Sequence, residues 1–307
     1  MNTEHIDNKL SHILEETKIA FEKVKEENPL TYCITNSVTV NDCANAVLAI
    51  GGSPIMAYNE EEVEEIINIS KSLVINIGNP NKDEIKTMEK ACYYANKKNI
   101  PIIFDPVGVG ISKLRNDLSL NLIQNYDLSI IRGNMSEIKA IYKLVNLDSL
   151  KLDSSKSKNQ EEKQKGVDVN INDITTKENL YENGILVKKL AKKLDTIIVA
   201  SGPIDLISDG NSIITIANGN DMMPKITGSG CMLSTIIGTY SGVNNPLISA
   251  ITASLHITIA GEKAGQYKKP TQELGLGTFH QYLIDYLYLL KESDIKKNAR
   301  INIIELD

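Results

Sequence analysis

A glycine-rich segment in the last third of the chain combines residue types that suit phosphoryl transfer. Residues 228–231 read Gly-Ser-Gly-Cys, and the apolar run 232–237 follows directly, which predicts a helix that begins there. The first N–H groups of such a helix point outward at the positive end of its dipole, so they favour an anion such as a transferring phosphoryl group. A thiol at this place, Cys231, is expected to have a lowered pKa. An isolated motif of this kind also fits a glycine-rich turn with a buried structural cysteine.

Two carboxylates just past predicted strands could hold a metal ion beside those phosphates. Asp105 opens the segment Asp-Pro-Val-Gly-Val-Gly, and Glu137 closes a segment that begins at Arg132. Mg²⁺ commonly takes one or two protein carboxylates and completes its shell with water and phosphate oxygens. Each acid could instead cap a helix, and Arg132 could pair with a phosphate or with a carboxylate. The sequence contains no Walker motif, which excludes a P-loop kinase.

The histidines do not suggest a hydrolytic site. His5 lies in a predicted N-terminal helix, His280 lies near the closing helix, and His256 lies within an apolar helical run. A Cys–His hydrolase needs an imidazole beside Cys231. His256 is better explained as a hydrogen-bonded residue of the core.

Short apolar strands alternate with helices along most of the chain, and this order would position the candidate residues. Strands are predicted at residues 30–34, 54–57, 72–77, 100–104, 128–131 and 195–200, and helices at 5–27, 40–50, 83–97, 246–260 and 277–291. This alternation is typical of an α/β fold with a mostly parallel sheet and helices on both faces. Ligands of such sheets bind at the carboxyl ends of the strands. The residues expected at that edge are Asn36, Met56, Asp105, Arg132 and Ser201.

The composition is that of a soluble globular protein. The chain has 307 residues, 42% hydrophobic and 23% charged, with a net charge of −6, so neither a nucleic acid nor an anionic membrane is an expected partner. The N-terminus lacks the apolar core of a signal peptide, and the four scattered cysteines fit reduced thiols, so a cytoplasmic location is expected. Residues 150–175 are polar, and we interpret them as a mobile surface insertion within a single domain of residues 1–307.

Six ordered motifs together resemble the hydroxyethylthiazole kinases, thiamine-salvage enzymes of the ribokinase-like superfamily. The motifs lie at residues 33–38, 52–57, 105–108, 131–138, 201–210 and 225–231, with Arg115 after the third. The resemblance implies a ribokinase-like three-layer fold and a homotrimer. It also implies ATP-dependent phosphorylation of the hydroxyl of 4-methyl-5-(2-hydroxyethyl)thiazole, with Mg²⁺ as cofactor.

The resemblance also assigns roles to single residues. Met56 and Gly228 would contact the thiazole, with Asn36 in the same pocket. Arg132 and Ser201 would bind ATP, and Asp105 and Glu137 would lie near the Mg²⁺–phosphate cluster. Cys231 occupies the place where most of the superfamily has an aspartate base, and the backbone amides from Gly228 through Gly230 to Cys231 would stabilise the moving phosphoryl group.

The sequence departs from the family pattern at a few places and leaves other functions open. Ser201 stands where the family often has Thr, and the insertion at 150–175 is longer than usual and could act as a lid. The alternatives are a kinase of the hydroxymethylpyrimidine type, a nucleotide-repair dehydratase of the same superfamily, or a catalytically weak thiazole-binding protein. The apolar segment 53–56 suits a thiazole better than an aminopyrimidine.

Overall fold

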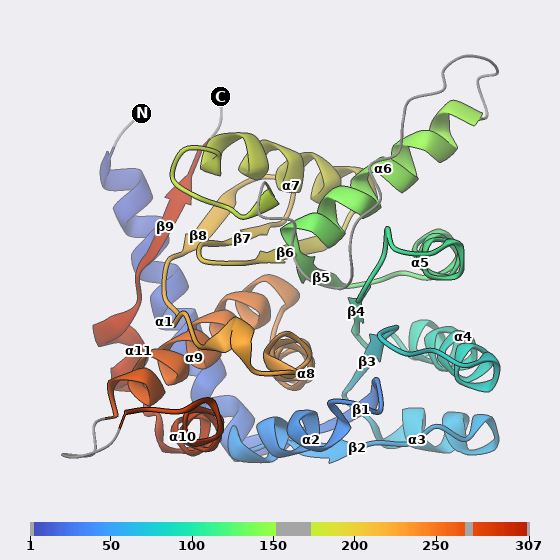
Figure 1. Cartoon of the computed structure of the whole chain (residues 1–307), viewed down its shortest axis with the longest axis horizontal. Coiled ribbons are helices and arrows are strands. Elements are labelled where there is room, and N and C mark those ends of the chain that lie inside the picture. Colours follow the sequence, from blue (N-terminus) through green and yellow to red (C-terminus); the bar gives the residue numbers. More distant parts are fainter. Residues whose placement is uncertain (1–2, 152–172, 268–272, 306–307) are drawn as a thin grey trace.

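A nine-stranded sheet runs through the part of the chain that the computed structural model describes, residues 3–151, 173–267 and 273–305 (Figure 1). The order of the strands across the sheet is β2-β1-β3-β4-β5-β6-β7-β8-β9. In chain order the strands are β1 (Leu30–Ile34), β2 (Ser53–Ile55), β3 (Ser72–Asn76), β4 (Ile102–Asp105), β5 (Ile130–Asn134), β6 (Ile197–Ser201), β7 (Asp205–Ser208), β8 (Ile213–Ile216) and β9 (Ile301–Ile304).

The first six strands are parallel and the last three are antiparallel to their neighbours. Only residues 202–204 separate β6 from β7, and only 209–212 separate β7 from β8. Connections this short permit hairpins but not the crossover that a parallel pair needs. The predicted, mostly parallel sheet is confirmed, although the sequence analysis did not identify β7, β8 and β9.

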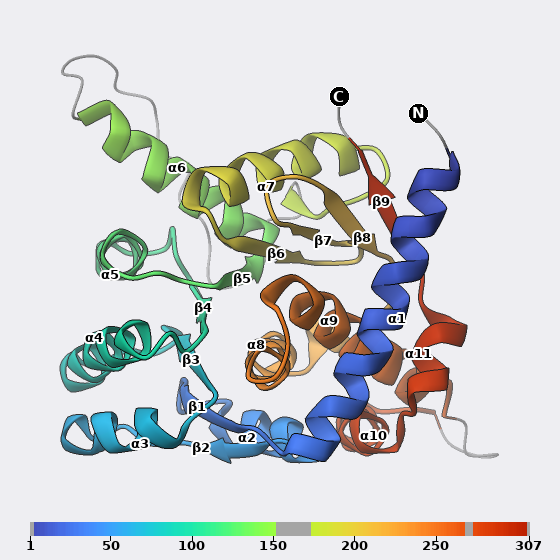
Figure 2. The same cartoon turned by 180° about the vertical axis from the view of Figure 1, so that it is seen from behind.

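Helices cover both faces of the sheet, as Figures 1 and 2 show from opposite sides. Alternate strand residues point to opposite faces: Val74 and Ile103 join one hydrophobic cluster, whereas Ile75 and Phe104 join the other. The first cluster is completed by α1 (Thr3–Glu27), α2 (Val40–Ala49), α8 (Ser229–Ser241), α9 (Pro246–Gln266), α10 (Leu276–Leu289) and α11 (Glu292–Asn298). The second is completed by α3 (Val63–Ile69), α4 (Lys82–Lys97), α5 (Lys113–Asn125), α6 (Met135–Lys151) and α7 (Leu180–Leu194). This is the three-layer arrangement expected of the ribokinase-like fold.

His256 is a core residue, as predicted. Its Nδ1 lies 2.8 Å from the hydroxyl of Tyr240 and its Nε2 lies 2.9 Å from the carbonyl oxygen of Leu287. Burial lowers its pKa to about 4, so the ring is neutral at physiological pH. Tyr240 lies nine residues after Cys231 on α8, about 14 Å along the helix axis, so His256 does not form a Cys–His pair.

The boundaries of some elements differ from the prediction. The strand expected from residue 195 begins at Ile197, because Asp195 adopts a left-handed conformation (φ 49°) that ends α7. Most of the predicted insertion at 150–175 lies outside the described residues. No helix of the described residues is both long and apolar enough to cross a bilayer.

Candidate active site

Polar side chains gather where the central parallel strands end, opposite the beginning of α8. Asn76 ends β3 and lies beside Asp105, which ends β4. Arg132 lies in β5. Ser201 ends β6 and is paired in register with Asn134 of β5. The structure therefore brings together the strand-end residues Asp105, Arg132 and Ser201 that the sequence analysis placed on one edge.

Arg132 connects the ends of β4 and β6. Its Nη2 donates to the hydroxyl of Ser201 at 2.5 Å, and its Nη1 lies 3.5 Å from Oδ2 of Asp105. Its side chain is only 8% exposed. A Cβ atom on Gly230 would lie 2.6 Å from Nη1, so the guanidinium occupies the space that a side chain at position 230 would need.

The two carboxylate oxygens of Asp105 have different surroundings. Oδ2 accepts hydrogen bonds from the hydroxyl of Ser234 at 2.6 Å and from Nδ2 of Asn76 at 3.1 Å. Oδ1 is buried and has no hydrogen-bond partner among the described residues. Burial raises the pKa of Asp105, and the charge of Arg132 opposes this shift. One oxygen is thus held firmly while the other remains available.

Glu137 is buried in the first turn of α6. Its Oε1 accepts from the N–H of Gly108 at 2.9 Å, and its Oε2 accepts from the N–H of Asn134 at 2.8 Å. The Asn134 side chain accepts in turn from the N–H of Glu137 at 2.9 Å, so the two residues cap α6 reciprocally. Burial, followed by the negative charge of Asp105, raises the pKa of Glu137 to about 7. The helix-cap alternative therefore describes part of what Glu137 does.

The N-terminus of α8 faces these residues. Gly228 has φ of +90°, and a Cβ atom there would lie 3.0 Å from Cγ2 of Thr39, so both backbone conformation and space favour glycine. The N–H of Met232 donates to the carbonyl of Gly228 at 2.8 Å. The amides of residues 229–231 precede that first helical hydrogen bond and have no acceptor within the helix.

Cys231 is a partly buried thiol whose sulfur accepts from two amides, Nδ2 of Asn76 at 3.2 Å and Nδ2 of Asn36 at 3.4 Å. Burial, followed by the charge of Asp105, raises the pKa of this thiol. The lowered pKa expected from the helix N-terminus is therefore wrong, because burial beside a carboxylate outweighs the helix dipole. Cys231 is protonated near neutral pH.

Two residues of this cluster, Asn76 and Ser234, were missed by the sequence analysis. Asn76 could have been found, because it is the polar residue at the end of an apolar strand, the same signal that marked Asp105. Ser234 gives no comparable signal, since its role depends on α8 meeting the end of β4. Met56 follows the edge strand β2 and packs against the hydrophobic cluster that contains α8.

A comparison with known protein families identifies the family of this chain. The model of the hydroxyethylthiazole kinase family matches residues 21–293. The chain belongs to this family. Among curated relatives, a hydroxyethylthiazole kinase of Methanobrevibacter smithii is 50% identical over 99% of both chains. One from Clostridium botulinum is 38% identical over 96% of this chain and 99% of the relative.

Solved structures agree with the family. A hydroxyethylthiazole kinase of Pyrococcus horikoshii, 31% identical, superposes with a TM-score of 0.78 over 94% of this chain and 99% of that one. A pyridoxal kinase of Staphylococcus aureus with bound AMP-PCP and pyridoxal superposes with a TM-score of 0.55 over 90% of this chain and 98% of that one. At 10% identity the second likeness concerns the fold alone. Family membership makes the chain a kinase.

Proposed function

We propose that this chain transfers the terminal phosphoryl group of ATP to the hydroxyl of 4-methyl-5-(2-hydroxyethyl)thiazole. The observation that carries this proposal is the position of the α8 N-terminus. The amides of residues 229–231 have no acceptor within α8, and Gly230 lies directly against the guanidinium of Arg132, which is paired with Asp105. Phosphoryl transfer depends mainly on positioned charge and hydrogen-bond donors, and this arrangement supplies both.

Each side of the cluster has a proposed ligand. Arg132 and Ser201, which are hydrogen-bonded to each other, bind the phosphates of ATP. Asn36, Met56 and Gly228 form the thiazole pocket on the opposite side. A guanidinium with several N–H donors suits phosphate oxygens, and the apolar Met56 suits a thiazole ring.

The carboxylates fit a Mg²⁺ ion. Oδ1 of Asp105 is buried without a partner among the described residues, and the charge of Asp105 contributes to the raised pKa of Glu137. A cation near both acids would relieve this repulsion. The described residues contain no group of three or more potential ligands, and Mg²⁺ requires only one or two carboxylates when it also binds phosphate. When bound, the ion would neutralise charge on the phosphates.

The protonated Cys231 is not a strong base in this proposal. A loose transition state for phosphoryl transfer does not require the alcohol to lose its proton beforehand. The amides of residues 229–231 stabilise charge on the moving group, which is the larger contribution. The neutral thiol lies beside the alcohol and does not take its proton, which passes late in the reaction to an oxygen of the transferred phosphoryl group.

Transfer of labelled phosphate from ATP tests the proposal. The enzyme should phosphorylate the thiazole alcohol with a kcat/KM at least a hundredfold above that for the hydroxymethylpyrimidine alcohol, assayed side by side with Mg²⁺ and with EDTA. A preference for the pyrimidine would support a kinase of the other type. Binding of the thiazole without transfer would support a catalytically weak binding protein. We further propose that the enzyme acts in the cytoplasm, which its four free cysteines support. We also propose that it forms a homotrimer, which the family resemblance supports.

A further inference from the structure

Asn76 is the most highly connected side chain at the ends of the strands. Its Oδ1 accepts from the N–H of Gly78 at 2.9 Å and from Nδ2 of Asn36 at 3.1 Å. Its Nδ2 donates to Oδ2 of Asp105 at 3.1 Å and to Sγ of Cys231 at 3.2 Å. The residue is 2% exposed. Two acceptor contacts and two donor contacts thus use one buried amide almost completely.

These partners fix which way the amide points. If the amide were flipped, its oxygen would face the carboxylate of Asp105, and its NH₂ would face the N–H of Gly78. Both contacts would then be repulsive, so only one orientation satisfies the network. Asn76 also lies in register with Asp105 on adjacent parallel strands. The backbone therefore keeps the two side chains together, and the amide has little freedom to leave.

The fixed amide determines how Asp105 and Cys231 present themselves. On Asp105, the donors from Asn76 and Ser234 both occupy Oδ2, which leaves Oδ1 as the oxygen without a partner among the described residues. On Cys231, the sulfur accepts from Asn76 and Asn36, so its own S–H is directed away from both amides. The carboxylate and the thiol are in this way oriented by one group.

From this geometry we infer that Asn76 is a positioning residue for phosphoryl transfer, which orients Asp105 and Cys231 through a single locked amide. The inference rests on the proposed function. Asn76 itself need not touch either substrate. It belongs to β3, between β1, after which Asn36 follows, and β4, which Asp105 ends, and it joins the thiazole side of the site to the phosphate side. Loss of its amide should therefore affect turnover more than binding.

Two substitutions test the inference. Asn76→Ser removes the donors to Asp105 and Cys231 and keeps a hydroxyl that can accept from Gly78, so the fold should be retained. Asn76→Leu is similar in size and removes every hydrogen bond. We expect kcat to fall about a hundredfold in either variant, because misplacement of reacting groups by about 1 Å has an effect of this size. KM for the thiazole alcohol and for ATP should stay within about threefold of the wild type.

A matched control separates positioning from simple loss of a buried asparagine. Asn218 is also 2% exposed, and its amide donates to Glu262 and to the carbonyl of Asn298, away from the strand-end cluster. Asn218→Ser should lower thermal stability at least as much as Asn76→Ser and leave kcat within about twofold. A merely structural role for Asn76 predicts equal effects of the two substitutions on kcat.

A double-mutant cycle tests whether Asn76 acts through Cys231. In a Cys231→Ala background, Asn76→Ser should lower kcat by only about tenfold, because the group that it helped to orient is gone. The same factor in both backgrounds would overturn the inference, as would a kcat within threefold of wild type in Asn76→Ser.

Crystal structures of the wild type and of Asn76→Ser provide a measure independent of activity. We expect the Cys231 sulfur or the Asp105 carboxylate to change rotamer in the variant, and unchanged positions of both groups would contradict the inference. If the wild-type enzyme failed to phosphorylate the thiazole alcohol, the proposed function would fall, whereas this structural comparison would still decide the role of Asn76.

Discussion

Position 230 shows how one residue controls the place of a functional charge. The Arg132 guanidinium passes over Gly230, and a Cβ atom there would lie 2.6 Å from Nη1 and 2.8 Å from Nη2. The guanidinium is the mobile end of a side chain, so it would move before the backbone did. A larger residue at 230 should therefore affect ATP binding more than stability.

We predict that Gly230→Ala raises KM for ATP about tenfold, since the displaced guanidinium weakens a charge-assisted hydrogen bond. Thermal unfolding should change little. The control is Gly277→Ala, because a Cβ on Gly277 would meet no atom within 4 Å. Steady-state kinetics of both variants provide the measurement, and an unchanged KM for ATP in Gly230→Ala would contradict the proposed place of the phosphates.

Cys231 gives the second prediction at this scale. Cys231→Ala should lower kcat about tenfold to a hundredfold without abolishing turnover, because the amides and charged groups that stabilise the phosphoryl group remain. Cys231→Asp should remain active, since a carboxylate can accept the proton of the alcohol. Single-turnover rates with radiolabelled ATP measure both. Complete loss of turnover in a folded Cys231→Ala enzyme would instead make the thiol indispensable.

Among the elements, the hairpin of β6 and β7 buries the carboxylate of Asp205, and this burial disfavours its charged form. Oδ1 of Asp205 accepts from the N–H of Gly202 at 2.9 Å, while its Oδ2 is buried without a partner among the described residues. Burial raises the pKa of Asp205 from 3.8 to about 7. Between these pH values the folded protein binds more protons than the unfolded chain, so this group destabilises the fold as pH rises.

Asp205→Asn should therefore stabilise the protein at pH 8, on the order of 4 kcal/mol, and have little effect near pH 4. Urea unfolding at both pH values measures the difference. The control is Asp209→Asn in the neighbouring turn. Asp209 accepts from the N–H groups of Asn211 and Ser212, and its pKa is lowered, so this variant should lose stability at pH 8. Equal effects of the Asp205 substitution at both pH values would show that its carboxyl does not titrate between them.

Arg115 holds two strand-end loops together from α5. It donates to the carbonyls of Ile77 at 2.8 Å, Gly78 at 2.5 Å and Val107 at 2.5 Å. These loops directly follow Asn76 and Asp105, the last residues of β3 and β4. Its place within the family resemblance is explained by this contact with the backbone.

Arg115→Met should destabilise the fold by about 3 kcal/mol, because three carbonyls lose a charged donor, and should lower kcat/KM through both loops. Lys113→Met is the control on the same helix, since the Lys113 side chain is 86% exposed and surface ion pairs contribute little. Chemical unfolding and kinetics of the two variants provide the test. Equal stability losses would rule out a specific role for Arg115.

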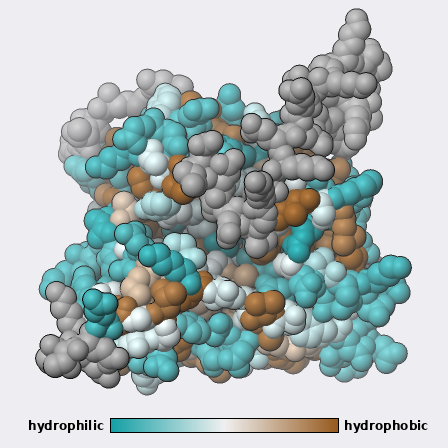
Figure 3. Space-filling view, viewed as in Figure 1, coloured by the Kyte–Doolittle hydropathy of each residue, from teal (hydrophilic) through white to brown (hydrophobic). Residues whose placement is uncertain are grey.

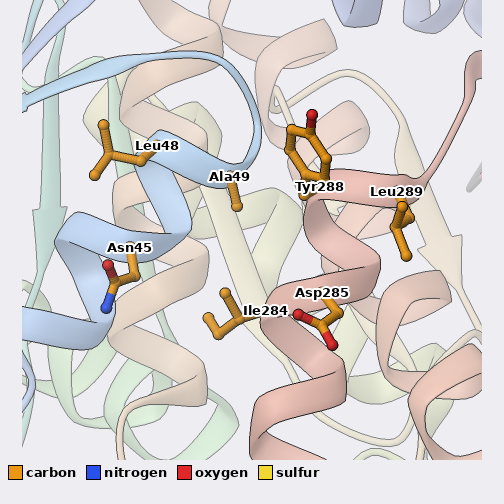
Figure 4. A pocket seen from close by; sticks show the side chains of 7 residues that line it. All are labelled: Asn45, Leu48, Ala49, Ile284, Asp285, Tyr288 and Leu289. Carbon is orange, nitrogen blue, oxygen red and sulfur yellow. The ribbon is translucent and has the colours of Figure 1, made fainter.

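At the scale of the whole molecule, one continuous sheet with a hydrophobic cluster on each face supports the proposal of a single domain. The face in Figure 3 is largely hydrophilic, with small hydrophobic groups set among polar residues. Elsewhere a groove of about 400 Å³ lies between α2 and α10 (Figure 4), lined partly by Leu48, Tyr288 and Leu289. These three side chains are 56%, 69% and 58% exposed, which is the kind of apolar surface that subunit contacts cover.

We predict a homotrimer in solution, with a mass about three times the 33.9 kDa of the chain. Light scattering coupled to size-exclusion chromatography measures this mass across a range of concentrations. A mass that stays at that of one chain would contradict the homotrimer and leave the chemistry of the strand-end cluster unaffected.

The sequence by itself determined the α/β architecture and the edge at which the chemistry lies. The alternation of apolar strands and helices requires a parallel sheet that helices cover on both faces. The topology of this sheet places Asp105, Arg132 and Ser201 at the carboxyl ends of neighbouring strands. The apolar residues around His256 in the sequence also predicted that this side chain is buried in the core. The ordered motifs also indicate the family from the sequence alone.

Only the tertiary structure decided how these groups affect one another. The pKa of Cys231 rises because burial and Asp105 act on it together, and neither is visible in a local sequence motif. The connections made by Asn76 depend on three strands and α8 meeting at one point, and the raised pKa of Asp205 depends on burial within a hairpin. Hydrogen bonding and desolvation act over a few ångströms in space, between residues as far apart in the chain as Asn36 and Cys231, which are 195 positions apart, so spacing along the sequence cannot specify them.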